Sequence, residues 1–187
     1  MRPADGAVAF AFEGYRRGMN HKTVANLGQP IPDLVRRLVV VASACNYGRD
    51  GTFTITSPGN SPKLITVGSL TDEETEDFSD DYVSSYSSRG PTLHDHVLKP
   101  DLLAHGNRVI SAKAVRGYLE SNHPQHLITA PGANKAEYYQ LSGTSMAAAV
   151  VSGTVALMLE KDPSLTPDTI KARLMRSAHK VDFPDVF

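Results

Sequence analysis

The sequence has few of the features that would point to a specialised class of protein. It contains one cysteine, Cys45, which excludes an internal disulfide framework and leaves the redox compartment open. Its 19 basic residues nearly balance 20 acidic ones, giving a net charge of −1. It therefore has no basic field to attract nucleic acid or an anionic membrane surface, and we expect neither as a partner.

Long apolar runs are also missing, and none approaches the roughly 20 residues that a membrane-spanning helix requires. Residues 1–6 include Arg2, but no uninterrupted apolar segment follows, so they do not read as a signal peptide. Two origins fit this pattern, an intracellular protein or a piece cut from a longer secreted precursor. The localisation therefore stays open.

The composition is that of one globular domain, with 41% hydrophobic and 21% charged residues in a chain of 187. Continuous β-branched runs predict buried strands at 38–44 and 64–70, and a third at 108–112. Residues 7–17 (AVAFAFEGYRR) predict a helix that is apolar nearly all round, and residues 21–28 a short strand after it.

Two helices are predicted near the end of the chain. The first, 144–161, is mostly apolar and should be largely buried; the second, 166–179, begins with Thr166 as its N-cap. Residues 127–130 and 138–141 are predicted to pair as a hairpin. Buried strands alternating with helices favour an α/β fold around a mainly parallel sheet.

Residues 71–81 (TDEETEDFSDD) form a dense acidic run. The simpler interpretation is a solvated loop. The alternative is a cation site built by Asp72, Asp77 and Asp81, because carboxylate oxygens are the ligands that hard cations prefer.

The segment Gly143-Thr144-Ser145-Met146-Ala147 is the most informative for chemistry. A serine in the first turn of a helix lies beside unpaired N–H groups and the positive end of the helix dipole. There its hydroxyl can attack a carbonyl while its own N–H helps to bind the oxyanion that forms. In an isolated Gly-Thr-Ser, however, a plain helix N-cap is the simpler interpretation.

The segment resembles the nucleophile motif of the subtilisin-like serine peptidases, in which the serine after threonine is the nucleophile; here that is Ser145. Further blocks resemble the family in the same order along the chain: 39–46 (VVVASACN), 57–68 (SPGNSPKLITVG), 84–91 (SSYSSRGP) and 99–112. The resemblance covers nearly the whole chain. It implies a three-layer α/β/α sandwich, N-terminally truncated, in which residues 1–187 form a single subtilase-like domain.

The resemblance also implies the roles of individual residues. Asn46, at the end of its strand, corresponds to the asparagine whose amide donates to the oxyanion together with the Ser145 N–H. The implied substrate-binding residues are Ala25, Asn26, Leu27, Gly28, Ala44, Cys45, Gly143 and Thr144. Cys45 replaces a glycine of the family, which would crowd the bottom of the specificity pocket. The implied partner is a peptide or protein substrate. No organic cofactor is implied; calcium is common in the family, but no ligand set can be traced.

In the family, the aspartate and histidine of the catalytic triad precede every block matched here. The chain begins too late to hold them, so the general base is not identified. His21 (in NHKTVA) lies in a segment with a slight resemblance to the family's histidine motif, but the same residues fit better as the strand after the first helix. His105 stands where the family has proline and is more simply structural; His94, His96, His123 and His126 are expected to face solvent.

Three functions remain open at this point. The first is a serine endopeptidase, present as a truncated or minimal form with weak or unconventional activity. The second is a non-catalytic peptide-binding or self-assembling module, in which an exposed sheet edge recruits another chain by strand addition or domain swapping. The third is an active minimal peptidase that uses His21 or His105 as a rearranged base.

Overall fold

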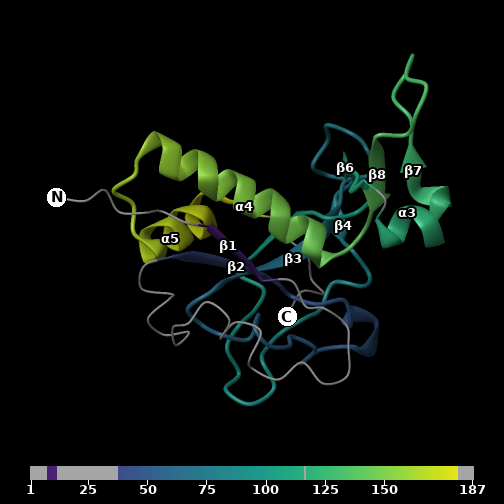
Figure 1. Ribbon diagram of the computed structural model, residues 1–187. Coiled ribbons are helices and arrows are strands. Elements are labelled where there is room, and N and C mark those ends of the chain that lie inside the picture. Colours follow the sequence, from purple (N-terminus) through teal and green to yellow (C-terminus); the bar gives the residue numbers. More distant parts are fainter. Residues whose placement is uncertain (1–7, 12–37, 116, 181–187) are drawn as a thin grey trace.

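The structure, a computed structural model, describes residues 8–11, 38–115 and 117–180 (Figure 1). The predicted strand at 21–28 lies outside the described residues. Among the described helices, none combines the length and the apolar character needed to cross a membrane.

The main sheet has five described strands. β1 (Val8–Ala11), β2 (Val39–Ser43), β3 (Ile65–Thr71) and β5 (Leu102–His105) run parallel, and β4 (Tyr82–Val83) pairs with β3 in the antiparallel sense. The mainly parallel sheet is therefore as predicted. Most residues of β2 and β3 are buried, as the continuous apolar runs indicated.

One prediction about this sheet is wrong, and one parallel strand has no counterpart among the predicted elements. Residues 8–11, expected to be helical, form strand β1, because each of them pairs with a residue of 39–42 on β2. A short apolar run fits a buried strand and a buried helix equally well, and the tertiary pairing decides between them. The sequence pattern does not predict a separate strand at 102–105, where the structure has β5 paired with β3.

A second, smaller sheet is antiparallel, in the order β6 (Val109–Ala112), β8 (Tyr138–Leu141), β7 (Leu127–Ile128). The hairpin of β7 and β8 is confirmed. The strand predicted at 108–112 is confirmed as β6, but the prediction that it is buried is wrong, because β6 lies in this smaller sheet and Ile110 is 52% exposed. At the hairpin tip Gly132 has a φ of +80°, with open space around it.

Short helical segments complete these regions. They are α3 (Tyr118–Asn122) beside the small sheet and two 3-10 turns, η1 (Gly48–Asp50) and η2 (Pro124–His126).

Helix α4 (Thr144–Lys161) has the predicted bounds and packs on β1, β2, β3 and β5 (Figure 1). Its residues Ala147, Val151 and Val155 join β2 and β3 in the main core. The prediction of a largely buried helix holds for this face only, because Val150 is 40% and Leu157 66% exposed.

Helix α5 (Pro167–Ser177) follows α4, and the predicted N-cap is confirmed. The Thr166 side chain accepts a hydrogen bond from the Thr169 N–H at 3.2 Å. The helix packs against β2 and buries Ile170 completely in the main core. Both α4 and α5 contribute to this core, so the described residues supply the sheet and one helical layer of the predicted sandwich.

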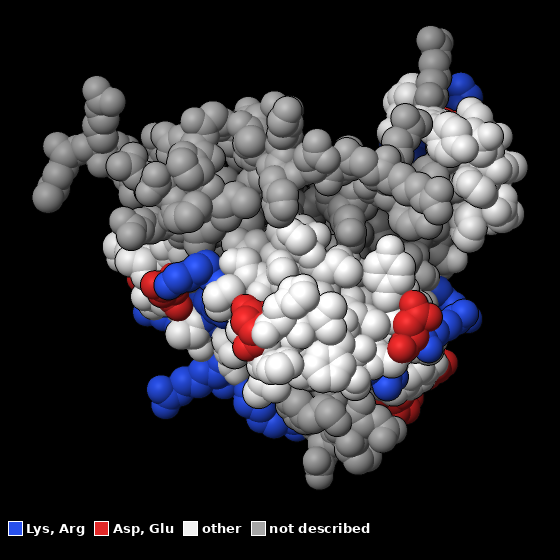
Figure 2. All heavy atoms as spheres, turned by 90° about the horizontal axis from the view of Figure 1, so that it is seen from below, with Lys and Arg blue, Asp and Glu red and all other residues white. Residues whose placement is uncertain are grey.

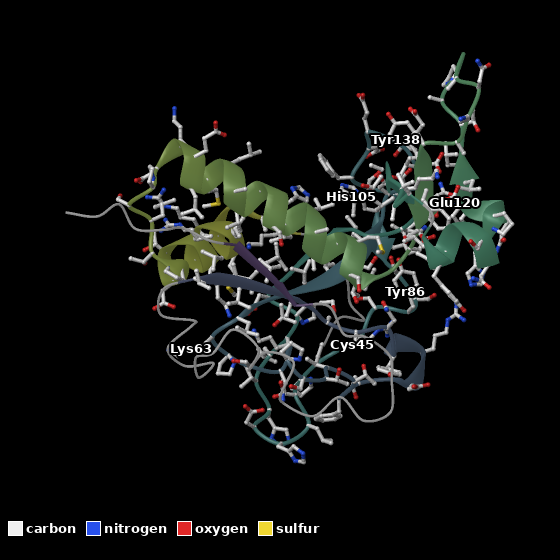
Figure 3. All side chains as sticks on the ribbon, in the orientation of Figure 1. Cys45, Lys63, Tyr86, His105, Glu120 and Tyr138 are labelled. Atoms are coloured by element: carbon white, nitrogen blue, oxygen red, sulfur yellow. The ribbon has the colours of Figure 1, made fainter. Side chains whose placement is uncertain are left out.

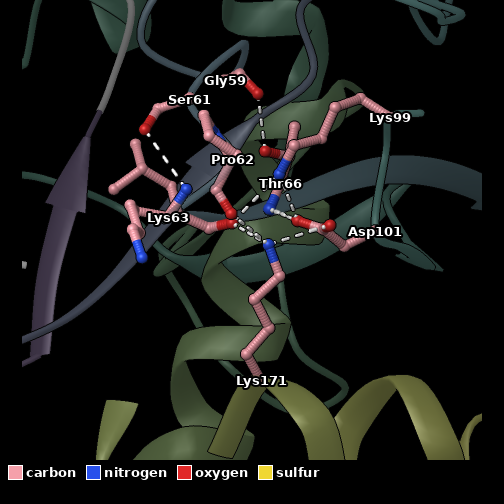
Figure 4. A network of polar contacts seen from close by, with 9 residues as sticks. Gly59, Ser61, Pro62, Lys63, Thr66, Lys99, Asp101 and Lys171 are labelled. Atoms are coloured by element: carbon pink, nitrogen blue, oxygen red, sulfur yellow. Dashed lines mark hydrogen bonds and ion pairs between the residues drawn. The ribbon is translucent and has the colours of Figure 1, made fainter. Parts of the chain in front are cut away.

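A buried ionic network ties α5 to the sheet (Figure 4). Lys99 donates to Asp101 Oδ2 at 2.6 Å and to Leu64 O at 3.1 Å, and Lys171 of α5 contacts Asp101 Oδ1 at 3.0 Å and Leu64 O at 2.7 Å. The Thr66 N–H also donates to Asp101 Oδ2, at 2.8 Å. Burial of the Lys99 ammonium lowers its pKa to about 8 despite the carboxylate beside it.

Candidate active site

The predicted nucleophile lies where the small sheet meets helix α4. Strand β8 ends at Leu141, and a turn leads into α4, whose second residue is the half-buried Ser145. Gly143, just before the helix, has a φ of +154°, which a residue with a side chain rarely adopts. This positive φ explains the glycine in front of the helix.

The N–H groups at the start of α4 have clear partners, with one exception. The Gly143 N–H donates to Gly106 O at 2.8 Å, and the Met146 N–H to Gly143 O at 3.0 Å. The Thr144 N–H donates to a side chain described below. For the Ser145 N–H, the described part of the chain offers no acceptor. A free donor at a helix N-terminus is a ready anion-binding group.

That side chain is Asn46, three residues beyond the end of β2. Its Oδ1 accepts from the Thr144 N–H at 3.0 Å and from Thr144 Oγ1 at 3.1 Å. A backbone N–H can pair only with the amide oxygen, so these contacts fix which way round the amide lies. Nδ2 is then left beside Gly143, 3.6 Å from where a Cβ on that glycine would be, and has no acceptor among the residues described. Two unpaired donors, Nδ2 and the Ser145 N–H, thus belong to the same helix terminus.

The residues before Asn46 are buried and tightly held. Ala44 is fully buried and donates its N–H to Val67 O at 2.9 Å. Cys45 is 3% exposed, with a φ of +83°, in the left-handed region that favours glycine. Its Sγ lies 2.6 Å from Thr56 Oγ1.

Gly106 is a part of this arrangement to which sequence reasoning gave no role. Its carbonyl accepts a hydrogen bond from the Gly143 N–H. A Cβ added to Gly106 would lie 2.4 Å from Ser69 Oγ and 2.8 Å from Gly143 O. No side chain fits there, so the close approach of β5 to the start of α4 requires glycine. The available signal was the glycine that follows His105 within the 99–112 block.

The structure thus brings together three of the predicted site residues around the helix terminus, Asn46, Gly143 and Thr144, with Ser145 next in the chain. Ala44 and Cys45 directly precede Asn46, and their contacts described above go to Val67 and Thr56. The remaining predicted residues, Ala25, Asn26, Leu27 and Gly28, and the low-ranked base His21, lie outside the described residues.

His105 is labelled in Figure 3 and ends strand β5. Its Nδ1 lies 3.1 Å from Asp72 Oδ2. Side chains alternate along a strand, and Leu102 and Ala104 pack against the core shared with α4, so His105 points to the opposite face of β5. This placement favours a structural role over that of a base for Ser145. His94, His96, His123 and His126 are exposed, as predicted.

The acidic run is a solvated loop. Residues 73–80 are all exposed, whereas Asp81 is buried, and its burial raises the pKa of its carboxyl. No three His, Cys, Asp or Glu side chains in the described ranges are grouped to hold a metal ion. This argues against the alternative of a cation site formed by Asp72, Asp77 and Asp81. On the face shown in Figure 2, charges of both signs occur.

The sequence profile of the Subtilase family matches residues 13–186. The chain belongs to the subtilase family. It is 41% identical over 143 residues to the serine protease AprX of Bacillus subtilis, which covers 76% of this chain and 30% of AprX. It is also 35% identical over 152 residues to an uncharacterized Aquifex aeolicus protein, covering 75% of this chain and 65% of that protein.

Solved subtilases share its fold. A cold adapted subtilisin-like serine proteinase superposes with a TM-score of 0.62 at 24% identity, over 96% of this chain and 50% of that one. Sphericase gives a TM-score of 0.61 at 23% identity, over 92% and 49%. The subtilisin-like α/β fold is therefore confirmed, and the chain spans about half the length of these solved structures.

Proposed function

We propose that this subtilase chain acts in serine-type endopeptidase chemistry, with Ser145 as the nucleophile and Asn46 as an oxyanion donor. The observation that carries the proposal is the pair of unpaired donors at the start of α4. The neighbouring backbone donors already have acceptors: the Gly143 N–H donates to Gly106 O, and the Thr144 N–H donates to Asn46 Oδ1. With respect to the described residues, the Ser145 N–H and Asn46 Nδ2 therefore remain for a ligand.

The chemistry follows from this arrangement. Attack of the Ser145 hydroxyl on a peptide carbonyl moves negative charge onto the carbonyl oxygen. Two fixed donors and the positive end of the α4 dipole stabilise that charge without reorganising during the reaction. Removal of one such donor slows peptidases of this fold by about 100- to 1,000-fold.

A general base is the component that the described residues do not supply, since no described histidine bonds to Ser145 and His105 faces away from α4. We propose that the imidazole and its aspartate come from the upstream part of a subtilase domain, as in the family. Oxyanion stabilisation and binding alone leave roughly 10³- to 10⁴-fold acceleration over water.

A fluorophosphonate probe tests the nucleophile. We expect mass spectrometry to find the label on Ser145, at a rate that rises when the part of AprX preceding the matched stretch is added. Ser145→Ala should abolish labelling, and Ser164→Ala, in an exposed turn, should not. Absence of label on Ser145 both alone and with the added segment would refute the proposal.

The rearranged-base alternative has its own test. If casein hydrolysis by the chain alone is detected and survives in both His21→Ala and His105→Ala, neither histidine is the base.

One observation favours self-assembly as a second candidate function. The outer face of α4 exposes Val150 and Leu157, and around Gly153 it has open space. A second copy packed on this face would cover apolar surface that a single copy leaves exposed. Sedimentation should then show a dimer that Leu157→Lys disrupts and Leu93→Lys, at a loop leucine of 58% exposure, does not. A monomer at all concentrations would exclude this candidate.

A further inference from the structure

Tyr86, labelled in Figure 3, is a half-buried residue of the 84–91 block. It is linked to the start of α4 by one backbone carbonyl, that of Gly106. Its hydroxyl donates to Gly106 O at 3.0 Å. The Gly143 N–H donates to the same oxygen at 2.8 Å. One carbonyl therefore links the tyrosine to the glycine that precedes Thr144 and Ser145.

A buried chain of hydroxyls holds the tyrosine in turn. Ser69 Oγ lies 2.9 Å from Tyr86 OH and 2.9 Å from Ser84 Oγ, and Thr71 Oγ1 lies 2.9 Å from the same Ser84 oxygen. Ser69, Ser84 and Thr71 are at most 5% exposed. Water cannot easily replace a lost partner in so dry a network, so its members have defined positions.

Packing fixes the Gly106 carbonyl from the other side. A Cβ at Gly106 would lie 3.0 Å from Ala147 Cβ and even closer to Gly143 O and Ser69 Oγ. The glycine is thus wedged between helix α4 and the hydroxyl chain. Its carbonyl has two lone pairs, and Tyr86 and Gly143 use one each.

We infer that Tyr86 is a positioning residue for the oxyanion-binding turn. It orients the Gly106 carbonyl, which holds the Gly143 N–H and so leaves the Ser145 N–H as the free backbone donor. If the carbonyl rotated, the Gly143 N–H would be released and the turn before Ser145 could shift. The part concerning catalysis rests on the proposed function; the part concerning the turn does not.

Tyr86→Phe removes the hydroxyl and keeps the ring. Tyr139→Phe is the matched control, because its hydroxyl also donates to backbone carbonyls, those of Leu119 and His123. Amide hydrogen exchange is followed by NMR at Gly143 and at Val155, which is buried in the middle of α4. We expect Gly143 exchange to accelerate about threefold to tenfold in Tyr86→Phe, with Val155 unchanged, as for loss of one hydrogen bond.

If Tyr86 only stabilised the fold as a whole, the exchange rates at Gly143 and Val155 would change together. If Gly143 and Val155 accelerate by the same factor, or Gly143 is unchanged, or Tyr139→Phe has the same effect at Gly143, the inference is overturned.

The effect of Tyr86 on catalysis is tested by measuring the rate at which a fluorophosphonate labels Ser145 in the presence of the upstream AprX segment. Tyr86→Phe should lower the maximal labelling rate about threefold to tenfold and leave the half-saturating probe concentration unchanged. An unchanged maximal rate would overturn the catalytic part. If wild-type chain is not labelled at all, the proposed function fails, and the exchange data still decide whether Tyr86 fixes the turn.

Discussion

At the scale of single residues, the two polar atoms of the Asn46 amide differ in role: the oxygen binds the start of α4, and the nitrogen is the proposed oxyanion donor. Its oxygen accepts from Thr144, and its nitrogen lies beside Gly143 with no acceptor in the described part of the chain. The contact joins residues 98 positions apart. The order of motif blocks predicted both partners from the sequence, but no local pattern gives the hydrogen bond between them, because only the pairing of distant elements brings them into contact.

The substitution Asn46→Asp keeps the acceptor oxygen and removes the donor nitrogen. A carboxylate still accepts from Thr144, and its charge suits a helix N-terminus, so the free energy of unfolding should stay the same or rise by a few tenths of a kcal/mol. The donor is lost, so Ser145 labelling should slow about 100- to 1,000-fold. Asn46→Ala, which loses both ends, should also destabilise by about 1 kcal/mol. Equal labelling rates in wild type and Asn46→Asp would mean that Nδ2 has no part in the reaction.

Cys45 occupies backbone that suits glycine, with a φ of +83°. Cys45→Gly and Cys45→Ala both lose the Sγ contact with Thr56 and differ mainly in this backbone cost. Glycine relieves the left-handed strain, but it also gives the unfolded chain more conformational entropy, which offsets part of that gain. We expect Cys45→Gly to be more stable than Cys45→Ala by about 0.5–1 kcal/mol in urea denaturation. The reverse order would contradict this account.

At the scale of elements, the two long helices α4 and α5 were easier to predict than the short strands β1 and β5. The bounds of α4 follow from Gly143 before it and the long apolar run within it, and Thr166 starts α5 by local chemistry. Strands β1 and β5 have only four residues each and depend on partners far along the chain. Their type is set by pairing with β2 and β3, which local sequence does not contain.

The N-cap of α5 can be measured directly. Thr166→Ala removes the acceptor of the Thr169 N–H and should lower the free energy of unfolding by about 1 kcal/mol. Thr154→Ala is the control, because that exposed hydroxyl donates to Val150 O within α4 and caps no helix end. It should have little effect or stabilise slightly. Equal losses in the two variants would show that capping is not the cause.

At the scale of the whole molecule, one buried carboxylate joins the sheet to the C-terminal helix. Asp101 has an ion pair with Lys99 on one oxygen and with Lys171 on the other. Removing the acid would leave two lysines without their counter-ion, which is usually far more costly than replacing an ion pair by apolar groups. Burial lowers the pKa of Lys99 to about 8, so the ammonium beside Asp101 is still protonated at pH 7 but is disfavoured relative to a lysine in water.

This network predicts a pH dependence. Below pH 8 Lys99 is protonated in both folded and unfolded chains. Between about pH 8, its pKa when folded, and 10.5, its ordinary value, the unfolded chain keeps a proton that the folded chain has lost. The contribution of Lys99 to the free energy of unfolding therefore rises with pH across this window.

The measurement compares denaturation of wild type and Lys99→Met from pH 7 to 10.5. The wild-type value should rise relative to the variant above pH 8, and Lys63→Met, at an exposed lysine, should follow wild type. A wild-type value that falls relative to Lys99→Met would mean that the coupling to Asp101 outweighs burial.

The open space around Gly132 has a practical consequence. The hairpin tip is an exposed loop, the kind of site at which proteins accept added sequence. A short epitope or a dye-binding tag inserted after this glycine should leave the melting temperature unchanged. A dye-binding tag there would provide a fluorescent handle on the chain for following the labelling and association experiments described above.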